Sequence, residues 1–522
     1  MRKILCLIMA AMTAFSAALF SWIPAGRAET SGDFAYYVLD DETVGIWEYT
    51  GRGGRVVIPE TLDGKRVSVI GNRSFANKGI TSVSIPDGVT RIGWSAFENN
   101  LLTSVTIPGS VAVIDEYAFS DNLLASLTIS SGVTEIGKGA FQRNQLTGHL
   151  EIPDSVVRIG EFAFSRNQLT GVKISNRVTV IEFAVFSMNQ LSRVDIPDGV
   201  TRIEGHAFQG NNLESVALPD SVTRIGEYAF IDNRLQSVAF PSNLRNIGEQ
   251  AFTRNKLTSA VIPGGVTEIG DWAFAWNEIE SLVLPSRMER LGEGAFAYNR
   301  LTDVTIPEGL ERMESNVFRG NRLTSAKIPQ GVASVGQSAF AHNELSELIL
   351  PAGLHTIEGF AFQSNRLAAV DLPDTLSEIG EWAFSGNELM ELHLPERLES
   401  IGAGAFSGNR LTRIVIPDGI KVLPHLSFAQ NQIAQAVIPP SVEEIADGLF
   451  IDTETLRVEG HVFDRNQENP ADLRIVGAPG SAAEKYALKH GHTFEAGSFS
   501  PPTAPSDGTG YGEQAETGRL NP

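Results

Sequence analysis

A phenylalanine recurs through most of this chain at a nearly constant spacing. Consecutive members of the series are 22 residues apart, except for one interval of 23 residues between Phe141 and Phe164. The eighteen members are Phe75, Phe97, Phe119, Phe141, Phe164, Phe186, Phe208, Phe230, Phe252, Phe274, Phe296, Phe318, Phe340, Phe362, Phe384, Phe406, Phe428 and Phe450. A period of this length, kept in register, is typical of a solenoid whose units bury their apolar side chains against their neighbours. The 522 residues are therefore expected to form mainly one repetitive domain. Length alone would suggest roughly three or four compact domains.

Each unit contains a short segment with the alternation of a β-strand. In Ser104–Ile107 the apolar residues occupy every second position, which predicts a strand with one buried face. Pro108 follows directly, and a proline there ends the strand because it has no amide proton for the sheet ladder. The one extra residue of the array, at Gly148–His149, is expected in the turn before a strand, where solenoids accept insertions.

The second half of the unit has a different spacing. Val111, Ile114, Ala118 and Phe119 are separated by three to four residues, apart from the last adjacent pair, which is the spacing of a helical turn. The sequence therefore predicts a return path of short helix or 3₁₀-helix, with these side chains in one continuous core.

An asparagine stands three residues after the phenylalanine in sixteen successive units, from Asn100 to Asn431. Its amide offers donors and an acceptor for turn backbone in its own and the adjacent coil, so the sequence predicts an internal hydrogen-bonded ladder and not a ligand site. The central members of this predicted ladder are Asn211, Asn233, Asn255, Asn277, Asn299 and Asn321.

The amino-terminal residues have the features of a secretory signal peptide. Arg2 and Lys3 precede an almost wholly apolar run from Ile4 to Pro24, and small residues lead up to Ala28, where cleavage is expected. An uncleaved membrane anchor is the competing interpretation, because the run is close to the ~20 residues that span a bilayer. Residues 498–522, rich in Pro, Gly, Ser and Thr, are predicted to be a disordered tail.

The repeat resembles the BspA-like class of leucine-rich repeats, found in secreted and surface proteins of bacteria and some parasitic protists. The resemblance rests on Leu-x-x-Val-x-Ile-Pro followed by Val-x-x-Ile-Gly-x-x-Ala-Phe, as in Leu257–Phe274 with Ala260 at the first valine position. It covers about residues 32–497, and departs from the family where asparagine replaces a frequent cysteine. It implies an α/β solenoid with a parallel β-sheet on the concave face and short helical or 3₁₀ turns on the convex face.

We expect five segments along the chain. They are a signal peptide (1–28), an amino-terminal β capping module (29–70), the repeat array of about eighteen coils (71–455), a carboxy-terminal capping strand and helix (456–497) and the tail (498–522).

Composition excludes several functions. The chain has 62 acidic and 41 basic residues, a net charge of −21, whereas nucleic-acid binding needs a basic surface. Its single cysteine, Cys6, excludes a disulfide framework and a multi-cysteine zinc site. The close pair His490 and His492 has no third ligand in view, and aspartates after the strand proline fit turns better than calcium sites. We therefore predict no catalytic residues, no metal, no cofactor and no enzymatic activity.

The residue between the two buried positions of each predicted strand should face solvent. Four consecutive members of this column are apolar, which predicts a partner site, although β-branched residues also simply favour strands. The predicted binding surface comprises Asp195, Ala217, Ala239, Val261, Val283, Thr305, Lys327 and Ile349.

Aromatic residues near the repeat phenylalanines form a second candidate surface. Tryptophan and tyrosine stack on sugar rings, but packing between adjacent coils explains them better, because glycine alternates with them in the same slots. This candidate face consists of Tyr228, Trp272, Trp276, Tyr298 and Trp382.

The resemblance and the extended sheet together favour a secreted or loosely surface-associated, monomeric scaffold that binds a protein of unknown identity, as an adhesion-type protein does. Binding of carbohydrate or a cell-wall polymer, and a passive spacer role, are the alternatives.

Overall fold

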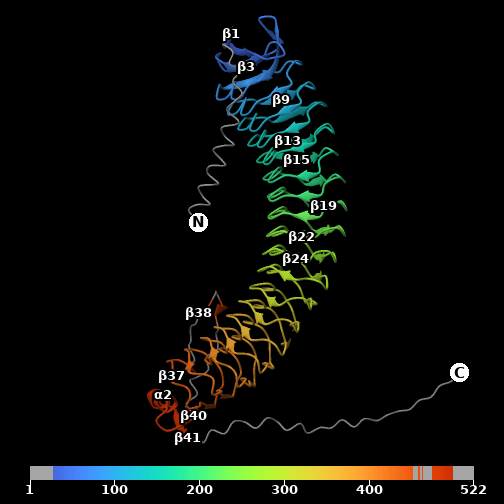
Figure 1. Ribbon diagram of the computed structural model, residues 1–522. Coiled ribbons are helices and arrows are strands. Elements are labelled where there is room, and N and C mark those ends of the chain that lie inside the picture. The colour runs from blue at the N-terminus through green and yellow to red at the C-terminus, as the bar shows by residue number, and fades with distance from the viewer. Residues whose placement is uncertain (1–27, 451–456, 459–460, 463–472, 498–522) are drawn as a thin grey trace, which may run out of the picture.

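The computed structural model describes residues 28–450, 457–458, 461–462 and 473–497. The predicted tail and, apart from Ala28, the predicted signal peptide lie outside the described residues. The coils follow one another in an elongated, curved stack that begins at the strands near β1 (Glu29–Ser31) and ends at α2 (Ala482–His490), as Figure 1 shows. The chain is thus a solenoid of stacked coils.

A first row of parallel strands runs along one side of the stack, one strand in most coils. In this row Ser104 to Ile107 pair with Ser126 to Ile129, exactly one repeat later in the sequence. The members are β4 (Gly54–Val57), β7 (Ile80–Ser84), β9 (Ser104–Ile107), β11 (Ser126–Ile129), β13 (Thr147–Glu151), β15 (Gln168–Lys173), β17 (Arg193–Asp195), β19 (Ser215–Ala217), β21 (Ser237–Ala239), β23 (Ser259–Val261), β25 (Ser281–Val283), β28 (Ser325–Lys327), β30 (Glu347–Ile349), β34 (Arg413–Val415), β36 (Gln435–Val437), β40 (Arg474–Gly477) and β41 (Thr493–Ala496). The coils at Val304, Val370 and Leu392 contribute no strand to it.

A second row of parallel strands, mostly two residues long, lies in the return half of the coils. Its members are β3 (Val44–Tyr49), β6 (Lys65–Ile70), β8 (Arg91–Ile92), β10 (Val113–Ile114), β12 (Glu135–Ile136), β14 (Arg158–Ile159), β16 (Val180–Ile181), β18 (Arg202–Ile203), β20 (Arg224–Ile225), β22 (Asn246–Ile247), β24 (Glu268–Ile269), β26 (Arg290–Leu291), β27 (Arg312–Met313), β29 (Ser334–Val335), β31 (Thr356–Ile357), β32 (Glu378–Ile379), β33 (Ser400–Ile401), β35 (Val422–Leu423) and β37 (Glu444–Ile445). A two-residue strand is too short to show alternation in the sequence, so this row was not predicted.

The predicted helical return path is replaced by this second row and by tight turns. Within the described residues α2 is the only helix, and the coils contain none. The cause is visible at Tyr117 and Asp121, two residues before and two after Phe119, which have φ of 56° and 54°. A left-handed residue interrupts the run of right-handed φ/ψ that a helix needs. The same two positions have positive φ in almost every coil, so no helical turn propagates.

The one extra residue of the array, at Gly148–His149, lies within a strand of the first row. It was expected in the turn before a strand, but Thr147–Glu151 forms β13, and its register to β15 shifts between Gly148 and His149. The insertion is therefore absorbed as a β-bulge, the usual way in which a strand accommodates one additional residue.

The repeat phenylalanines form one continuous stack through the core. Neighbouring ring centroids are 5.0 Å apart at the closest pair, Phe75 and Phe97, and 6.2 Å apart at the widest, Phe428 and Phe450. Tyr49 stacks on Phe75 at one end, and Tyr486 of α2 packs edge-on against Phe450 at the other. The aromatic core is thus closed at both ends by tyrosine.

The two ends of the stack have their own strands. At the amino-terminal end β2 (Phe34–Val38) lies antiparallel between β1 and β3, and β5 (Thr61–Leu62) pairs with β6. At the other end β40 continues the first row beside β36, and β41 follows β40. Helix α2 begins after its N-cap Ser481, which accepts a hydrogen bond from the amide of Glu484, and ends at Gly491. Strands β38 (Arg457–Val458) and β39 (His461–Val462) form a separate antiparallel pair.

The asparagines bind backbone in two adjacent coils. The amide nitrogen of Asn211 donates to the carbonyl oxygens of Phe208 and Phe186, and its Oδ1 accepts from the amide of Leu191 at 3.0 Å. Asn233, Asn255, Asn277, Asn299 and Asn321 make the same set of bonds in their own coils. All six are buried, so they satisfy turn groups that water does not reach.

Candidate functional site

The outward residues of the first strand row form a column across the middle of the molecule, although β21 and β23 are not hydrogen-bonded to each other. In β19 and β21 the valines point into the core, whereas Ala217 and Ala239 are exposed and pair with each other. In β23 and β25 the exposed positions are held by Val261 and Val283, with 63% and 51% of their surfaces accessible. Exposed valines at these fractions place apolar surface in water.

Four serines lie beside this apolar column. Ser215, Ser237, Ser259 and Ser281 are the outward residues that begin β19, β21, β23 and β25, and all four are exposed. We call these serines together with Ala217, Ala239, Val261 and Val283 the strand patch. The serines were not included in the surface predicted from the sequence, although a serine recurs at this position in four successive coils. Because every member of the patch is small, its surface is flat.

The remaining predicted surface residues lie at the two ends of the strand patch. Asp195 precedes it in β17 and pairs with Ala217, while its carboxylate binds Arg193 at 3.1 Å. Thr305 follows it, in a coil without a first-row strand. Lys327 and Ile349 pair with each other in β28 and β30, and 56% of Ile349 is exposed. The predicted surface is therefore one column whose strand ladder is interrupted between β21 and β23 and again at Thr305.

The predicted aromatic face is divided over several coils. Trp272, Trp276 and Tyr298 form a stack, with centroid distances of 5.2 and 5.1 Å and interplanar angles of 15° and 14°. The guanidinium of Arg254 lies over Trp276 as well, 5.9 Å from its centroid. Trp382 lies apart from this group, against Gly404 of the next coil.

Tyr228 belongs to a different aromatic group. Its ring stacks on His206 at 4.6 Å, and His206 in turn contacts Phe183. The hydroxyl of Tyr228 donates to Glu249 at 2.6 Å, and this bond, with burial, raises the pKa of Tyr228 to about 12. His206 and Phe183 were not in the predicted face, although His206 occupies the same slot of its coil as Tyr228.

The ring faces of these residues are largely occupied by protein. At a centroid distance near 5 Å, almost parallel rings lie face to face with an offset, not side by side in one plane. Trp276 accordingly has Trp272, Tyr298 and Arg254 as ring neighbours. Sugar binding needs an open ring face, so this arrangement supports packing between coils more than a sugar platform.

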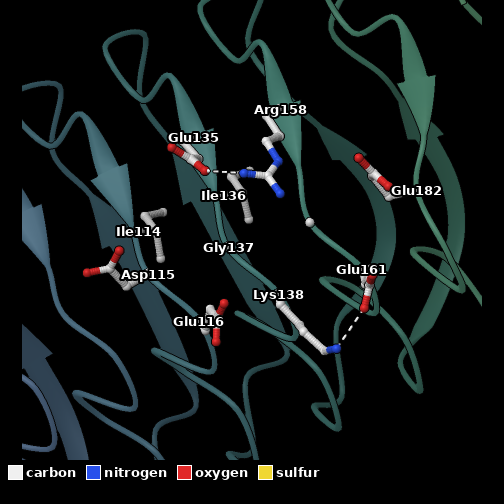
Figure 2. Close-up of a pocket in the computed structure, with 11 residues that line it drawn as sticks. Ile114, Asp115, Glu116, Glu135, Ile136, Gly137, Lys138, Arg158, Glu161 and Glu182 are labelled. Carbon is white, nitrogen blue, oxygen red and sulfur yellow. Dashed lines mark hydrogen bonds and ion pairs between the residues drawn. The ribbon is translucent and has the colours of Figure 1, made fainter. Parts of the chain in front are cut away.

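A cavity of about 350 Å³ opens along the second strand row, between Asp115 and Glu182. Figure 2 shows its charged side chains projecting from successive coils around Gly137. A Cβ on Gly137 would come within 2.6 Å of the backbone of Asp115, and Gly160 is similarly close to Lys138. These two glycines therefore allow the backbones of adjacent coils to approach closely beside the cavity.

The charges around the cavity are mostly paired with each other. Arg158 binds Glu135 at 3.1 Å and Lys138 binds Glu161 at 2.7 Å, as the dashed lines in Figure 2 mark. Glu182 has no ion pair within the described part of the chain, and burial raises the pKa of its carboxyl. Carboxylates, one arginine and one lysine provide the polar lining, and within the described residues the carboxylates do not form a group of three that could hold a metal ion.

The histidine pair lies at the carboxy-terminal end. His490 is at the end of α2, where its Nε2 lies 3.2 Å from Oδ1 of Asp447 and its ring contacts Tyr486. His492 follows the helix, 6.3 Å from His490 between ring centroids. Across the residues that the structure describes, no three metal-binding side chains come together. Nor does any helix in these ranges have the length and apolar character needed to cross a membrane.

The sequence is similar to a known repeat family over most of its length. It matches the model of the BspA type leucine rich repeat region (6 copies) over residues 67–191, 123–234, 223–346 and 334–457. Among curated protein sequences it has no significant match.

Several solved structures are similar to the chain. A leucine rich cell surface protein from Faecalibacterium prausnitzii A2-165 is 24% identical, with a TM-score of 0.28, over 88% of this chain and 97% of that one. A leucine-rich repeat protein from Bacteroides ovatus ATCC 8483 is 19% identical, with a TM-score of 0.36, over 79% and 94%. The pneumococcal vaccine antigen PcpA is 17% identical, with a TM-score of 0.29, over 91% and 99%.

Proposed function

We propose a function for this chain from the premise that it belongs to the BspA-type leucine-rich repeat family. Membership implies a scaffold for protein interactions, because in such repeats the stacked coils provide an extended surface whose variable positions decide what is bound. The chain is an exported, non-enzymatic, monomeric scaffold of the adhesion type. It acts outside the cell, either released or loosely associated with the surface.

The strand patch is the surface through which this scaffold binds a protein. The observation that carries the proposal is the exposure of Val261 and Val283 in adjacent strands, next to Ala217 and Ala239 in the two strands before them. Burying such side chains against a partner releases about 25 cal/mol for each Å² of apolar surface removed from water. The flat serine column beside them lets a partner approach closely.

The geometry gives less support to carbohydrate or cell-wall binding through the aromatic face. Trp276 and Tyr298 are 42% and 37% exposed, but stacking uses the ring faces that a sugar would need. A passive spacer would need no exposed valines in one place. These two alternatives are therefore ranked below protein binding.

A capture experiment with matched variants tests the proposal. The mature chain is immobilised and exposed to extracellular-matrix, host-cell and bacterial-envelope extracts, and the dissociation constant of each retained protein is then measured. A quadruple variant, Ala217→Ser, Ala239→Ser, Val261→Ser and Val283→Ser, should bind such a protein at least about tenfold more weakly, a change of about 1.4 kcal/mol. Unchanged binding by this variant would exclude the strand patch.

A second pair of valines provides the control. Val415 and Val437 occupy the same column of β34 and β36, pair with each other and are half-buried. The double variant Val415→Ser and Val437→Ser removes comparable side chains from the same sheet position and should bind as the wild type does. Circular dichroism of all three proteins checks that the solenoid remains folded.

A further inference from the structure

We infer that the strand patch takes a flat protein surface with an aliphatic centre and a border of lysine and arginine. The inference rests on the proposed function and specifies the chemistry of its partner. It follows from two properties of the patch, its small uncharged centre and the charge of the residues around it.

The centre of the strand patch fits another flat surface. Its outward side chains are serine, alanine and valine only, in four successive strands. Adjacent strands are about 4.8 Å apart, and two sheets that pack face to face are about 10 Å apart. With no long side chain in the way, a partner sheet can reach that distance and cover Val261 and Val283.

The border of the strand patch is acidic. Glu214 and Glu280 directly precede its serines in β19 and β25, and Asp220 follows Ala217 by three residues. Asp198 occupies the equivalent position of the preceding coil, and Asp303 begins the outward column of the next one. All five side chains are exposed.

These five carboxylates have no intramolecular cation. Within the described ranges none of them makes an ion pair, whereas Asp195 at the same border is bound to Arg193 and Glu308 lies 4.0 Å from Lys327. Arg234 and Lys256, three residues before Ser237 and Ser259, and Arg287 are basic residues of the border that also make no ion pair in these ranges, so the five carboxylates outnumber the unpaired cations by two. The border therefore has a net negative charge that a partner with lysine and arginine neutralises.

A second copy of the chain does not meet this requirement. Two identical patches placed face to face would bring together two borders that both have a net negative charge. The whole chain also has a net charge of −21, so two copies repel each other at low salt. The partner is instead a different protein with a basic border, and its association should slow as salt screens the attraction.

Synthetic hairpins of defined chemistry test this inference directly. The first probe is a backbone-cyclised β-hairpin peptide with four valines on one face and lysines at its ends. The second has glutamates in place of the lysines, and the third has serines in place of the valines. Binding of each to the mature chain is measured by surface plasmon resonance at 50 and 300 mM sodium chloride.

We expect the lysine-valine hairpin to bind at least tenfold more tightly than the other two, and at least fivefold more weakly at the higher salt concentration. The quadruple serine variant should lose this binding. A border variant, Glu214→Gln, Asp220→Asn and Glu280→Gln, should weaken it at low salt, and the Val415→Ser, Val437→Ser control should leave it unchanged.

Three results would overturn the inference. They are equal binding of the lysine and glutamate hairpins, binding of the lysine-valine hairpin that survives in the quadruple serine variant, and no binding of any hairpin. The two proposals fail separately. If the quadruple variant loses its captured protein but the border variant binds that protein normally at low salt, the patch is the binding site and only its charge preference is wrong.

Discussion

Trp272 covers Gly294, the residue one repeat further along the chain, so closely that a Cβ on this glycine would overlap the indole. Gly294 also has φ of +57°, in the left-handed region where a side chain is strained. Tyr117 and Gly139, Tyr298 and Gly320, and Trp382 and Gly404 repeat this relationship in other coils. In these four pairs the large ring of one coil occupies the space that a side chain on the glycine of the next coil would need.

Gly294→Ala should destabilise the coils around it. The left-handed backbone disfavours alanine by about 1 kcal/mol, and the overlap with Trp272 adds a packing cost, so we expect a loss of about 2 kcal/mol. Urea unfolding, followed by hydrogen exchange in the coils on either side, measures the change.

Gly264→Ala is the matched control for this substitution. A Cβ on Gly264 would meet no atom within 4 Å, and its φ lies outside the positive range. We expect a change within about 0.5 kcal/mol. Equal destabilisation by the two substitutions would show that the cover of Trp272 over Gly294 is not responsible.

Much of the solenoid could be predicted because its core repeats exactly. The core positions of Phe119 and Asn122 follow from the repeat period alone. Each makes the contacts with its own and the adjacent coil that its counterparts make in the other coils. The return path could not be predicted, because the spacing of Val111, Ile114 and Ala118 suits both a helical turn and a strand followed by tight turns. The left-handed φ of Tyr117 decides between them, and tyrosine rarely signals such a conformation.

The candidate site was predictable only in part. Alternation in the strands placed Val261 and Val283 on the outside correctly. The contacts of Trp276 were not predictable, because which ring stacks on which depends on the offset between coils and not on the residue types. The repeat period predicts which position of a coil each residue occupies. The contacts between side chains of adjacent coils can be known only from the three-dimensional structure.

Asn211→Ala should open its coil locally. The substitution leaves the buried amide of Leu191 and the carbonyl oxygens of Phe186 and Phe208 with fewer partners. Unsatisfied buried groups cost about 1–3 kcal/mol each, so we expect a total loss of about 3 kcal/mol. Hydrogen exchange at the Leu191 amide should become markedly faster.

The adjacent residue supplies the control for this change. Asn212 makes no side-chain hydrogen bond within the described structure, although its backbone amide binds Leu191. Asn212→Ala should therefore leave exchange at the Leu191 amide unchanged. If both substitutions accelerate exchange to the same extent, the ladder does not have the stabilising role that its bonds indicate.

Glu182→Gln should stabilise the protein at neutral pH. Burial raises the pKa of the Glu182 carboxyl; Arg158 opposes this shift, and the carboxylates of Glu204 and Glu161 add to it. A carboxyl with a raised pKa stabilises the fold fully below its unfolded pKa and loses this effect as pH rises through its folded pKa. At pH 7 the charged form is therefore unfavourable, and glutamine removes that cost.

Thermal unfolding at several pH values measures this effect. The melting temperature of the Glu182→Gln variant should exceed that of the wild type at pH 7, and the difference should disappear below about pH 4. Glu161→Gln, which removes the ion pair with Lys138, should not raise the melting temperature. A stabilisation by Glu182→Gln that is the same at every pH would argue against a titrating carboxyl as its cause.

Acid should weaken the attachment of α2 to the last coil. Asp447 holds Lys489 at 2.5 Å and His490 at 3.2 Å, and these two bonds lower the pKa of Asp447. A lowered pKa means that the contribution to stability is present above the unfolded value, near 3.8, and is lost as pH falls through the folded value. Asp447→Asn should therefore lower the hydrogen-exchange protection factors of α2 at pH 7. Asp418→Asn, at an exposed turn, should leave them unchanged. Unchanged exchange in the Asp447 variant would show that the apolar contacts of α2 hold it alone.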